Sequence, residues 1–173
     1  MKPATTPPRI ITLIFLMAGS MLSLNMFLPS LNQMASEFGV SYAVMNLSLS
    51  GYLAVTAVLQ VIFGPLSDRY GRRPVLLGSA AVFVIASVGC VLVTNIWAFL
   101  ALRIFQGAII AGSALSRAVI RDMMSPKEAV GVLGTTAMAM AIAPMLGPII
   151  GGFLEQTFGW RASFYLFILI GLG

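Results

Sequence analysis

The sequence is built mainly from long apolar segments, and this feature limits the chain to very few kinds of fold. The first segment, residues 10–31, has 22 residues and no charge. At 1.5 Å per residue, a helix of that length crosses the ~30 Å hydrocarbon layer of a bilayer. Hydrophobic residues make up 59% of the chain and charged residues only 9%, whereas soluble domains have about 25% charged residues. We therefore expect a membrane protein.

Six apolar runs follow one another along the chain. They cover residues 10–31, 43–66, 75–93, 96–120, 131–154 and 160–173. Because the sixth is shorter than the roughly 20 residues that span a bilayer, we predict five complete membrane helices and part of a sixth. A cleaved signal peptide is the alternative for the first run, with Lys2 and Arg9 as its basic region, but the run is too long for a signal core. The predicted fold is an all-α membrane bundle over residues 10–173, preceded by a tail of residues 1–9.

The basic residues predict which side of the membrane each connection faces. Eight of the ten lie in the tail and around the second and fourth connections: Lys2, Arg9, Arg69, Arg72, Arg73, Arg117, Arg121 and Lys127. Since basic residues concentrate on the cytoplasmic side, we expect the N-terminus and residues 64–73 to be cytoplasmic in a multi-pass protein of the inner membrane. The basic residues form no patch interleaved with aromatic side chains, so we expect no nucleic-acid partner.

The supply of reactive side chains argues against an enzyme. The chain has no histidine, and its single cysteine, Cys90, lies in an apolar run. This excludes Ser-His and Cys-His pairs, histidine zinc sites and an internal disulfide. The five acids lie outside the middle of the runs: Glu37, Asp68, Asp122, Glu128 and Glu155. We therefore expect no catalytic residue, no metal site and no cofactor.

The fourth run combines an arginine with a face of small residues. Gly107, Ala111, Ala114 and Ala118 recur on one helical face, and Arg103 lies one turn before them on the same face. Small residues let membrane helices approach closely, so Arg103 is expected to point into the bundle. Two interpretations remain open for it. It could face a proton path or substrate, or it could bond to backbone carbonyls of a neighbouring helix or extend to the outer surface.

Polar and methionine side chains in the first two runs are candidates for lining a cavity. Tyr52, Thr56 and Gln60 are spaced one helical turn apart, and Met21 and Asn25 have the same spacing. Such side chains suit a cavity that accepts varied apolar ligands. The alternative for each is an interhelical hydrogen bond or a packing contact.

The fifth run is rich in glycine and proline. Small residues recur every fourth position in it: Thr135, Ala139, Ala143, Gly147 and Gly151. Pro144 and Pro148 lie on the same segment, and this composition predicts a bent helix whose backbone touches a partner. A tightly packed, kinked helix with no part in transport is the other interpretation.

Together these segments resemble the major facilitator superfamily. Motif A of that family is matched by Gly64, Asp68, Arg69, Gly71, Arg72 and Arg73. Arg103, Gln106 and Gly107 resemble motif B, and Gly147, Pro148, Gly151 and Gly152 resemble the antiporter motif C. The longer form of motif C includes Gly134 and a second glycine, at whose position this chain has Ala143. The segment from Asn25 to Pro29 resembles Bcr/CflA-type drug efflux proteins.

The resemblance implies a fold and a gate. Members of the superfamily have two six-helix halves, each a pair of inverted three-helix repeats, and this chain resembles the N-terminal half. Motif A implies a cytoplasmic gate in which Asp68, at a helix N-terminus, pairs with nearby arginines and with a helix end from the other half. Arg72 and Arg73 are expected to pair with Asp68 and Asp122, while Gly64 and Gly71 permit a tight turn and close helix contact. The other interpretation of this segment is a basic loop that only sets topology.

The resemblance also implies a secondary active transporter that works by alternating access. The expected function is multidrug efflux by proton antiport, with small apolar or cationic substrates, a C-terminal half as partner and the bilayer as surroundings. Related efflux proteins place an acid where this chain has Asn25, which carries no proton. Coupling would then come from the other half, from Arg103 with water, from Glu37, or be absent. A facilitator or symporter of small metabolites and a non-transporting half are the alternatives.

Overall fold

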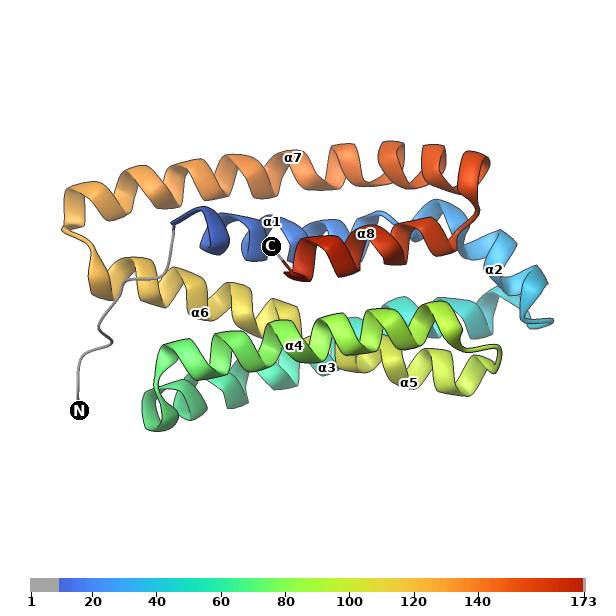
Figure 1. Ribbon diagram of the computed structural model, residues 1–173, viewed down its shortest axis with the longest axis horizontal. Coiled ribbons are helices and arrows are strands. Elements are labelled where there is room, and N and C mark those ends of the chain that lie inside the picture. Colours follow the sequence, from blue (N-terminus) through green and yellow to red (C-terminus); the bar gives the residue numbers. More distant parts are fainter. Residues whose placement is uncertain (1–9, 173) are drawn as a thin grey trace.

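The computed structural model describes residues 10–172, and the chain is helical over almost all of them. The elements are α1 (Ile10–Asn25), the 3-10 turn η1 (Leu28–Ser30), α2 (Leu31–Glu37), α3 (Tyr42–Tyr70), α4 (Arg72–Leu92), α5 (Ile96–Gln106), α6 (Ala108–Met123), α7 (Pro126–Phe158) and α8 (Arg161–Leu172) (Figure 1). No strand occurs between residues 10 and 172. The predicted all-α fold is confirmed.

Four helical segments are long and apolar enough to cross a membrane. They are Tyr42–Tyr70, Arg72–Leu92, Ile96–Asp122 and Pro126–Phe158, and the shorter α8 is also apolar. The third of these segments includes both α5 and α6. Gly107 lies between the two helices, and its N–H donates to the Ile104 carbonyl three residues back (3.0 Å), as in a 3-10 turn. The fourth apolar run is therefore a helix with one tightened turn at its centre.

The first apolar run does not form one uninterrupted helix. α1 ends at Asn25, and the chain then passes through η1 into α2, which ends at Glu37. Pro29 lies in the first turn of η1. Proline lacks the N–H needed to continue a helix and clashes with the preceding turn, which explains the break.

Serine and glycine residues define the ends of the longest helices. The Ser41 hydroxyl accepts from the Val44 N–H at the start of α3. The Ser125 hydroxyl accepts from the Glu128 N–H at the start of α7, and the Glu128 carboxylate completes a capping box. At the other ends of these helices, Gly71 and Gly159 have φ values of +93° and +79°, a backbone conformation that favours glycine.

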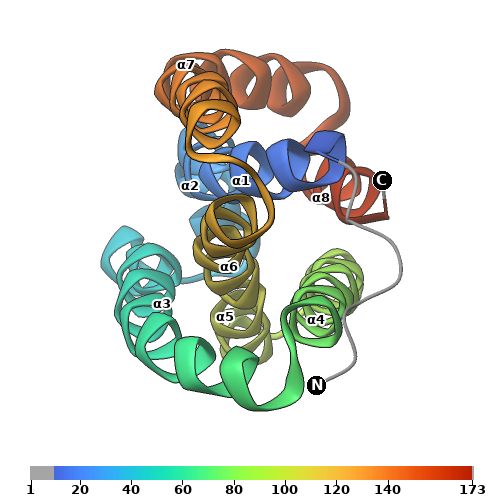
Figure 2. The same cartoon turned by 90° about the vertical axis from the view of Figure 1, so that its left-hand side faces the viewer.

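The helices form two triplets that are arranged as an inverted repeat. The first triplet is α1 with its extension α2, then α3 and α4, and the second is α5 with α6, then α7 and α8. In the end view, α1 and α5/α6 lie at the centre, with α7 beside α1 and α3 beside α5/α6 (Figure 2). Thus the second helix of each triplet packs on the first helix of the other triplet. The third helices, α4 and α8, pack against each other.

Candidate functional site

The motif A segment is almost entirely helical. α3 continues through Tyr70, α4 begins at Arg72, and Gly71 alone connects them. Asp68 therefore lies in the last turn of α3, and the prediction that it sits at a helix N-terminus is wrong. The predicted apolar run ended at residue 66. The helix itself continues through the polar residues 67–70 and is interrupted only at Gly71.

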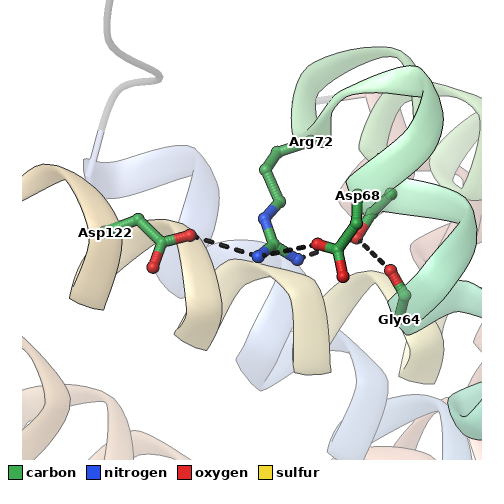
Figure 3. Close-up of polar contacts among 5 residues, drawn as sticks. Gly64, Asp68, Arg72 and Asp122 are labelled. Atoms are coloured by element: carbon green, nitrogen blue, oxygen red, sulfur yellow. Dashed lines mark hydrogen bonds and ion pairs between the residues drawn. The ribbon is translucent and has the colours of Figure 1, made fainter.

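A network of polar contacts centres on Arg72 (Figure 3). One terminal nitrogen of its guanidinium lies 3.1 Å from an Asp68 carboxylate oxygen and 3.2 Å from an Asp122 carboxylate oxygen. Its other terminal nitrogen donates to the Ser67 hydroxyl at 2.8 Å. That hydroxyl donates in turn to the Gly64 carbonyl at 2.7 Å. We call these five residues the Arg72 cluster.

The Arg72 cluster joins three helices through bonds that can break easily. Asp68 belongs to α3, Arg72 to α4 and Asp122 to α6. The side chains of Arg72, Asp68 and Asp122 are 33%, 67% and 53% exposed. Ion pairs exposed to this extent contribute at most about 1 kcal/mol each. The geometry therefore suits a reversible contact between helices.

The other arginines of the segment do not share these contacts. Arg73 is exposed, and within residues 10–172 neither acid pairs with it, so its predicted pairing is wrong. Arg69 lies over the Tyr70 ring, 5.5 Å from its centroid. A side chain at Gly64 would meet no atom within 4 Å, so the expected close helix contact at Gly64 does not occur among the described residues.

Arg103 lies wholly inside the bundle. It is 0% exposed, so it does not extend to the surface. One terminal nitrogen donates to the Gln106 side-chain oxygen at 2.5 Å, and the other lies 3.5 Å from the Ser23 carbonyl of α1. The Gln106 amide nitrogen donates to the Ser87 hydroxyl of α4 at 2.7 Å. The arginine is thus bonded to α1 directly and to α4 through Gln106.

Three aromatic rings surround the Arg103 guanidinium. Its central carbon lies 3.9 Å from the centroid of Phe27, 4.8 Å from that of Tyr52 and 5.8 Å from that of Phe164. Ring faces attract cations, especially where water is excluded. The arginine Nε and the Tyr52 hydroxyl are nevertheless buried without a hydrogen-bond partner in the described part of the chain.

The polar stripe on α3 divides into buried and exposed positions. Tyr52 and Thr56 are 0% and 3% exposed, and the Thr56 hydroxyl donates to the Leu53 carbonyl at 2.8 Å. A Cβ atom on Gly107 would lie 2.8 Å from a Thr56 methyl carbon. Tyr52 and Thr56 therefore pack where α3 meets α5/α6, while Gln60 is exposed.

The motif C helix α7 touches the end of α1 at its glycines. A Cβ atom on Gly151 would lie 1.7 Å from the Met26 carbonyl oxygen, and one on Gly147 would lie 2.9 Å from the Asn25 Cβ. Only glycine permits this approach. The Asn25 side-chain nitrogen donates to the Met21 carbonyl of its own helix at 2.8 Å, and both of these side chains are half-buried.

The remaining motif C residues lie at different depths along α7. Ala143 is buried, and Gly152 is half-buried, where a Cβ atom would lie 4.0 Å from the Pro29 Cβ. Pro148 is half-buried, whereas Gly134 and Pro144 are exposed. A methyl group on Gly134 would meet no atom within 4 Å, so this glycine makes no close contact with the described helices.

Two contributors to the site were not predicted from the sequence. Ser67 lies inside the motif A segment, and Ser87 lies in α4, 19 residues from its partner Gln106. The spacing of Ser67, three residues after Gly64 and five before Arg72, was an available signal, because helical residues three apart share a face. Ser87 carried no such signal.

All five acids lie in the first or last turn of a helix. Glu37 ends α2, Asp68 and Asp122 lie in the last turns of α3 and α6, and Glu128 and Glu155 lie in the first and last turns of α7. The carboxylates of this chain are thus placed at the ends of the bundle, and Arg103 has no acidic partner among the described residues.

Comparisons with known proteins agree with this architecture. The family model described as Major Facilitator Superfamily matches residues 13–173. The chain is 37% identical to the chloramphenicol resistance protein of Pseudomonas aeruginosa, over 88% of this chain and 36% of that protein. It is 32% identical to a bicyclomycin resistance protein homolog of Haemophilus influenzae, over 93% of this chain and 42% of that protein.

A third relative is multidrug resistance protein D of Escherichia coli, 29% identical over 93% of this chain and 41% of that protein. The chain therefore spans about two fifths of the length of the curated relatives it matches. It is a multi-pass membrane protein. With the family model matching nearly all of its residues, the chain belongs to the Major Facilitator Superfamily and has the fold of that family's N-terminal six-helix half.

Proposed function

We propose that this chain forms the N-terminal half of a multidrug efflux transporter that works by alternating access and exchanges drugs for protons. The observation that carries the proposal is the Arg72 cluster, in which one guanidinium joins α3, α4 and α6. The match of the chain to relatives named for resistance to chloramphenicol, bicyclomycin and multiple drugs supports drugs as substrates.

The Arg72 cluster acts as the cytoplasmic gate in this proposal. While its pairs are formed, the ends of α3, α4 and α6 are held together. Because each pair is partly exposed, the difference between the paired and separated states is small, and binding of substrate or protons elsewhere can shift it. The excess of basic residues at this end supports a cytoplasmic location.

Proton coupling needs a group that titrates within the membrane. Every acid of this chain lies at a helix end, and Asn25 carries no proton. We therefore place the coupling carboxylate in the C-terminal half of the transporter. Arg103 would influence the pKa of such a carboxylate by its charge, because charges interact strongly in a water-poor interior.

Substitution of Arg72 tests the gate. Arg72→Lys keeps the positive charge, but an ammonium group cannot reproduce the fork that reaches two acids and a hydroxyl at once. We expect drug-sensitive cells that produce the full transporter to lose about fivefold of their resistance to toxic dyes, since the loss of one pair of about 1 kcal/mol changes an equilibrium roughly fivefold.

Arg73→Lys is the matched control, because Arg73 is the adjacent residue, is exposed and lacks these contacts. It should leave resistance unchanged at equal protein level. Equal loss of resistance in both variants, or no loss in either, would contradict the proposed role of Arg72.

A further inference from the structure

The second triplet repeats the local structure of the motif A segment at the other end of the bundle. The Gly71 N–H donates to the carbonyl four residues back in α3 at 2.9 Å, and the Gly159 N–H does the same in α7 at 3.0 Å. Both glycines have positive φ and extended ψ, +93° and 152° for Gly71 and +79° and 167° for Gly159. In both cases a new helix begins within two residues.

The sequences at the two turns follow the same order. Residues 64–72 have a glycine, an acid four positions later, then the turn glycine and Arg72 directly after it. Residues 151–161 have a glycine, Glu155 four positions later, then the turn glycine, Trp160 and Arg161. The second copy is longer by two residues, one of which is Trp160.

The arginine of the second turn also joins the two triplets. An Arg161 terminal nitrogen lies 2.7 Å from a Glu37 carboxylate oxygen. The Trp160 indole nitrogen donates to the other Glu37 oxygen at 2.5 Å, and the Arg161 guanidinium lies 4.3 Å from the Trp160 ring centroid. The Arg161 Nε donates to the Val91 carbonyl at the end of α4 at 3.3 Å. We call Glu37, Trp160 and Arg161 the Arg161 cluster.

The two clusters have the same relation to the inverted repeat. Arg72 begins the third helix of the first triplet, and its partner Asp122 lies near the end of α6 in the second triplet. Arg161 begins the third helix of the second triplet, and its partner Glu37 ends the α1–α2 segment of the first triplet. The two clusters lie at opposite ends of the bundle, where α3 meets α4 and where α7 meets α8 (Figure 1).

From these correspondences we propose that the Arg161 cluster is the counterpart of the Arg72 cluster, and that it fastens the two triplets together at the opposite end of the bundle. This proposal does not depend on what the protein transports. Glu155 does not pair with Arg161. Its carboxylate accepts a hydrogen bond from the Ser30 hydroxyl of η1 at 3.3 Å, which is a further contact between the two triplets at this end.

The Arg161 cluster is better anchored than the Arg72 cluster. Trp160 is 2% exposed and packs edge-on against Phe99 and Phe164, with ring centroids 6.0 and 5.7 Å apart. Its indole N–H is thus held in place by the aromatic core, and Glu37 is its acceptor. The two triplets are therefore joined more firmly at this end of the bundle than at the Arg72 end.

A double-mutant cycle tests the pairing on the chain itself in detergent. Trp97→Phe leaves Trp160 as the sole tryptophan of the two, so its fluorescence reports unfolding at the cluster. In this background, Glu37→Gln and Arg161→Gln should each lower the unfolding midpoint by about 2–4 °C, a shift expected for one net interaction in a chain of this size. Because each residue also has a bond of its own, to Val91 or to Trp160, the double variant should fall further than either single variant but by less than the sum of the two shifts.

Additive shifts would overturn the proposal, because they would mean that the two residues act independently. Glu128→Gln is the matched control, since Glu128 is an acid that caps its own helix at the other end of the bundle. Its effect should add to that of Arg161→Gln.

Crosslinking is a second test, and it reports whether residues 37 and 161 lie close together without relying on a change in the unfolding midpoint. In a Cys90→Ser background, Glu37→Cys with Arg161→Cys should be joined by a short bismaleimide, whereas Glu128→Cys with Arg161→Cys should not. Failure of the first pair to crosslink in folded protein would overturn the proposal. Neither experiment measures transport, so their failure would leave the proposed drug efflux untouched.

Discussion

Arg103 is fully buried and contacts groups from four helices through its own atoms or through Gln106. The Ser23 carbonyl belongs to α1, Tyr52 to α3, Ser87 to α4 and Phe164 to α8. An arginine in a membrane interior must be compensated by carbonyls, rings, an acid or water. Here carbonyl, amide and ring contacts supply the compensation, so the residue holds the bundle together as well as carrying charge.

Removal of this side chain should destabilise the bundle strongly. Arg103→Ala leaves the Gln106 amide oxygen without its donor in a buried position, which costs about 1–3 kcal/mol, and it empties the space between three rings. We expect a lower unfolding midpoint and a smaller monodisperse fraction on size-exclusion chromatography. Arg121→Ala, at an exposed position near the end of α6, is the control and should behave like the parent chain.

The Glu37 carboxyl should report acidification at its end of the bundle. The Trp160 hydrogen bond, followed by the hydrogen bond and charge of Arg161, lowers the pKa of Glu37 below its usual value despite partial burial. A carboxyl whose pKa is lowered on folding stabilises the fold above its unfolded pKa. This contribution disappears as the pH falls through the lower, folded pKa.

In the Trp97→Phe chain, Trp160 emission should therefore change with a midpoint below about pH 4.3, the ordinary value for glutamate. Glu37→Gln should abolish the change. Glu155→Gln should retain it, although Glu155 is the other acid at this end of the bundle. A midpoint at or above the ordinary value, or a change that persists in Glu37→Gln, would refute the assignment.

At the level of elements, the contact of α7 with the end of α1 depends on glycine. A Cβ atom at Gly151 would lie 1.7 Å from the Met26 carbonyl oxygen and 2.7 Å from the carbonyl carbon. These are backbone atoms and cannot move aside as a flexible side chain can. Gly151→Ala should therefore separate the two helices and reduce the yield of folded protein.

Gly134→Ala is a control within the same helix, because a methyl group there meets no atom within 4 Å. Alanine favours a helix over glycine by about 1 kcal/mol, so this variant should be as stable as the parent chain or slightly more so. The measurement is the unfolding midpoint of each purified variant in one detergent. Equal midpoints for the two alanine variants would show that the close contact is not required.

Local signals explain how much of the fold could be predicted. The long apolar runs predicted the helices, and the glycine before Arg72 predicted the turn. The end of α1 was missed although Pro29 was a visible signal, because apolar character continued through it to residue 31. The tightened turn at Gly107 was missed because one glycine within an apolar run does not reveal whether it bends the helix or only admits a neighbour.

Contacts between distant residues could not be predicted in the same way. Asp122 was expected to pair with Arg72 or Arg73, but the sequence did not indicate that Arg72 alone would bond to it, 50 residues away. The bond from Trp160 to Glu37 crosses 123 residues. Both contacts depend on how the helices cross, and the pattern of side chains along the sequence does not determine the crossing. The burial of Tyr52 and Thr56 against Gly107 depends on the same packing.

For the whole molecule, the inverted repeat accounts for the placement of the charged clusters. Each triplet contributes one arginine and one acid, and each arginine pairs across to the other triplet. The ion pairs thus lie at the two ends, while the centre holds Arg103, buried serine, threonine and glutamine side chains, and apolar side chains. In the proposed transporter, the Arg161 cluster keeps the two triplets joined at one end of this half, while the Arg72 cluster can open at the other end.

The large apolar side chains left exposed on the described helices fit such a partner or lipid. α7 exposes Met138, Met145, Ile149 and Phe153, and α3 exposes Val61 among others. In water these side chains would form an unstable apolar surface, whereas in a bilayer they can face lipid or the other half. The expected membrane location and the proposed second half both agree with this surface.

Proton-driven drug efflux is the central claim, and its most direct test is dye transport in everted membrane vesicles that contain the full transporter. Energised vesicles should accumulate a fluorescent cationic dye against its gradient, and a protonophore should abolish the accumulation. Vesicles with Arg72→Lys should accumulate about fivefold less dye, while those with Arg73→Lys should match the parent. Accumulation that survives collapse of the proton gradient would contradict proton antiport.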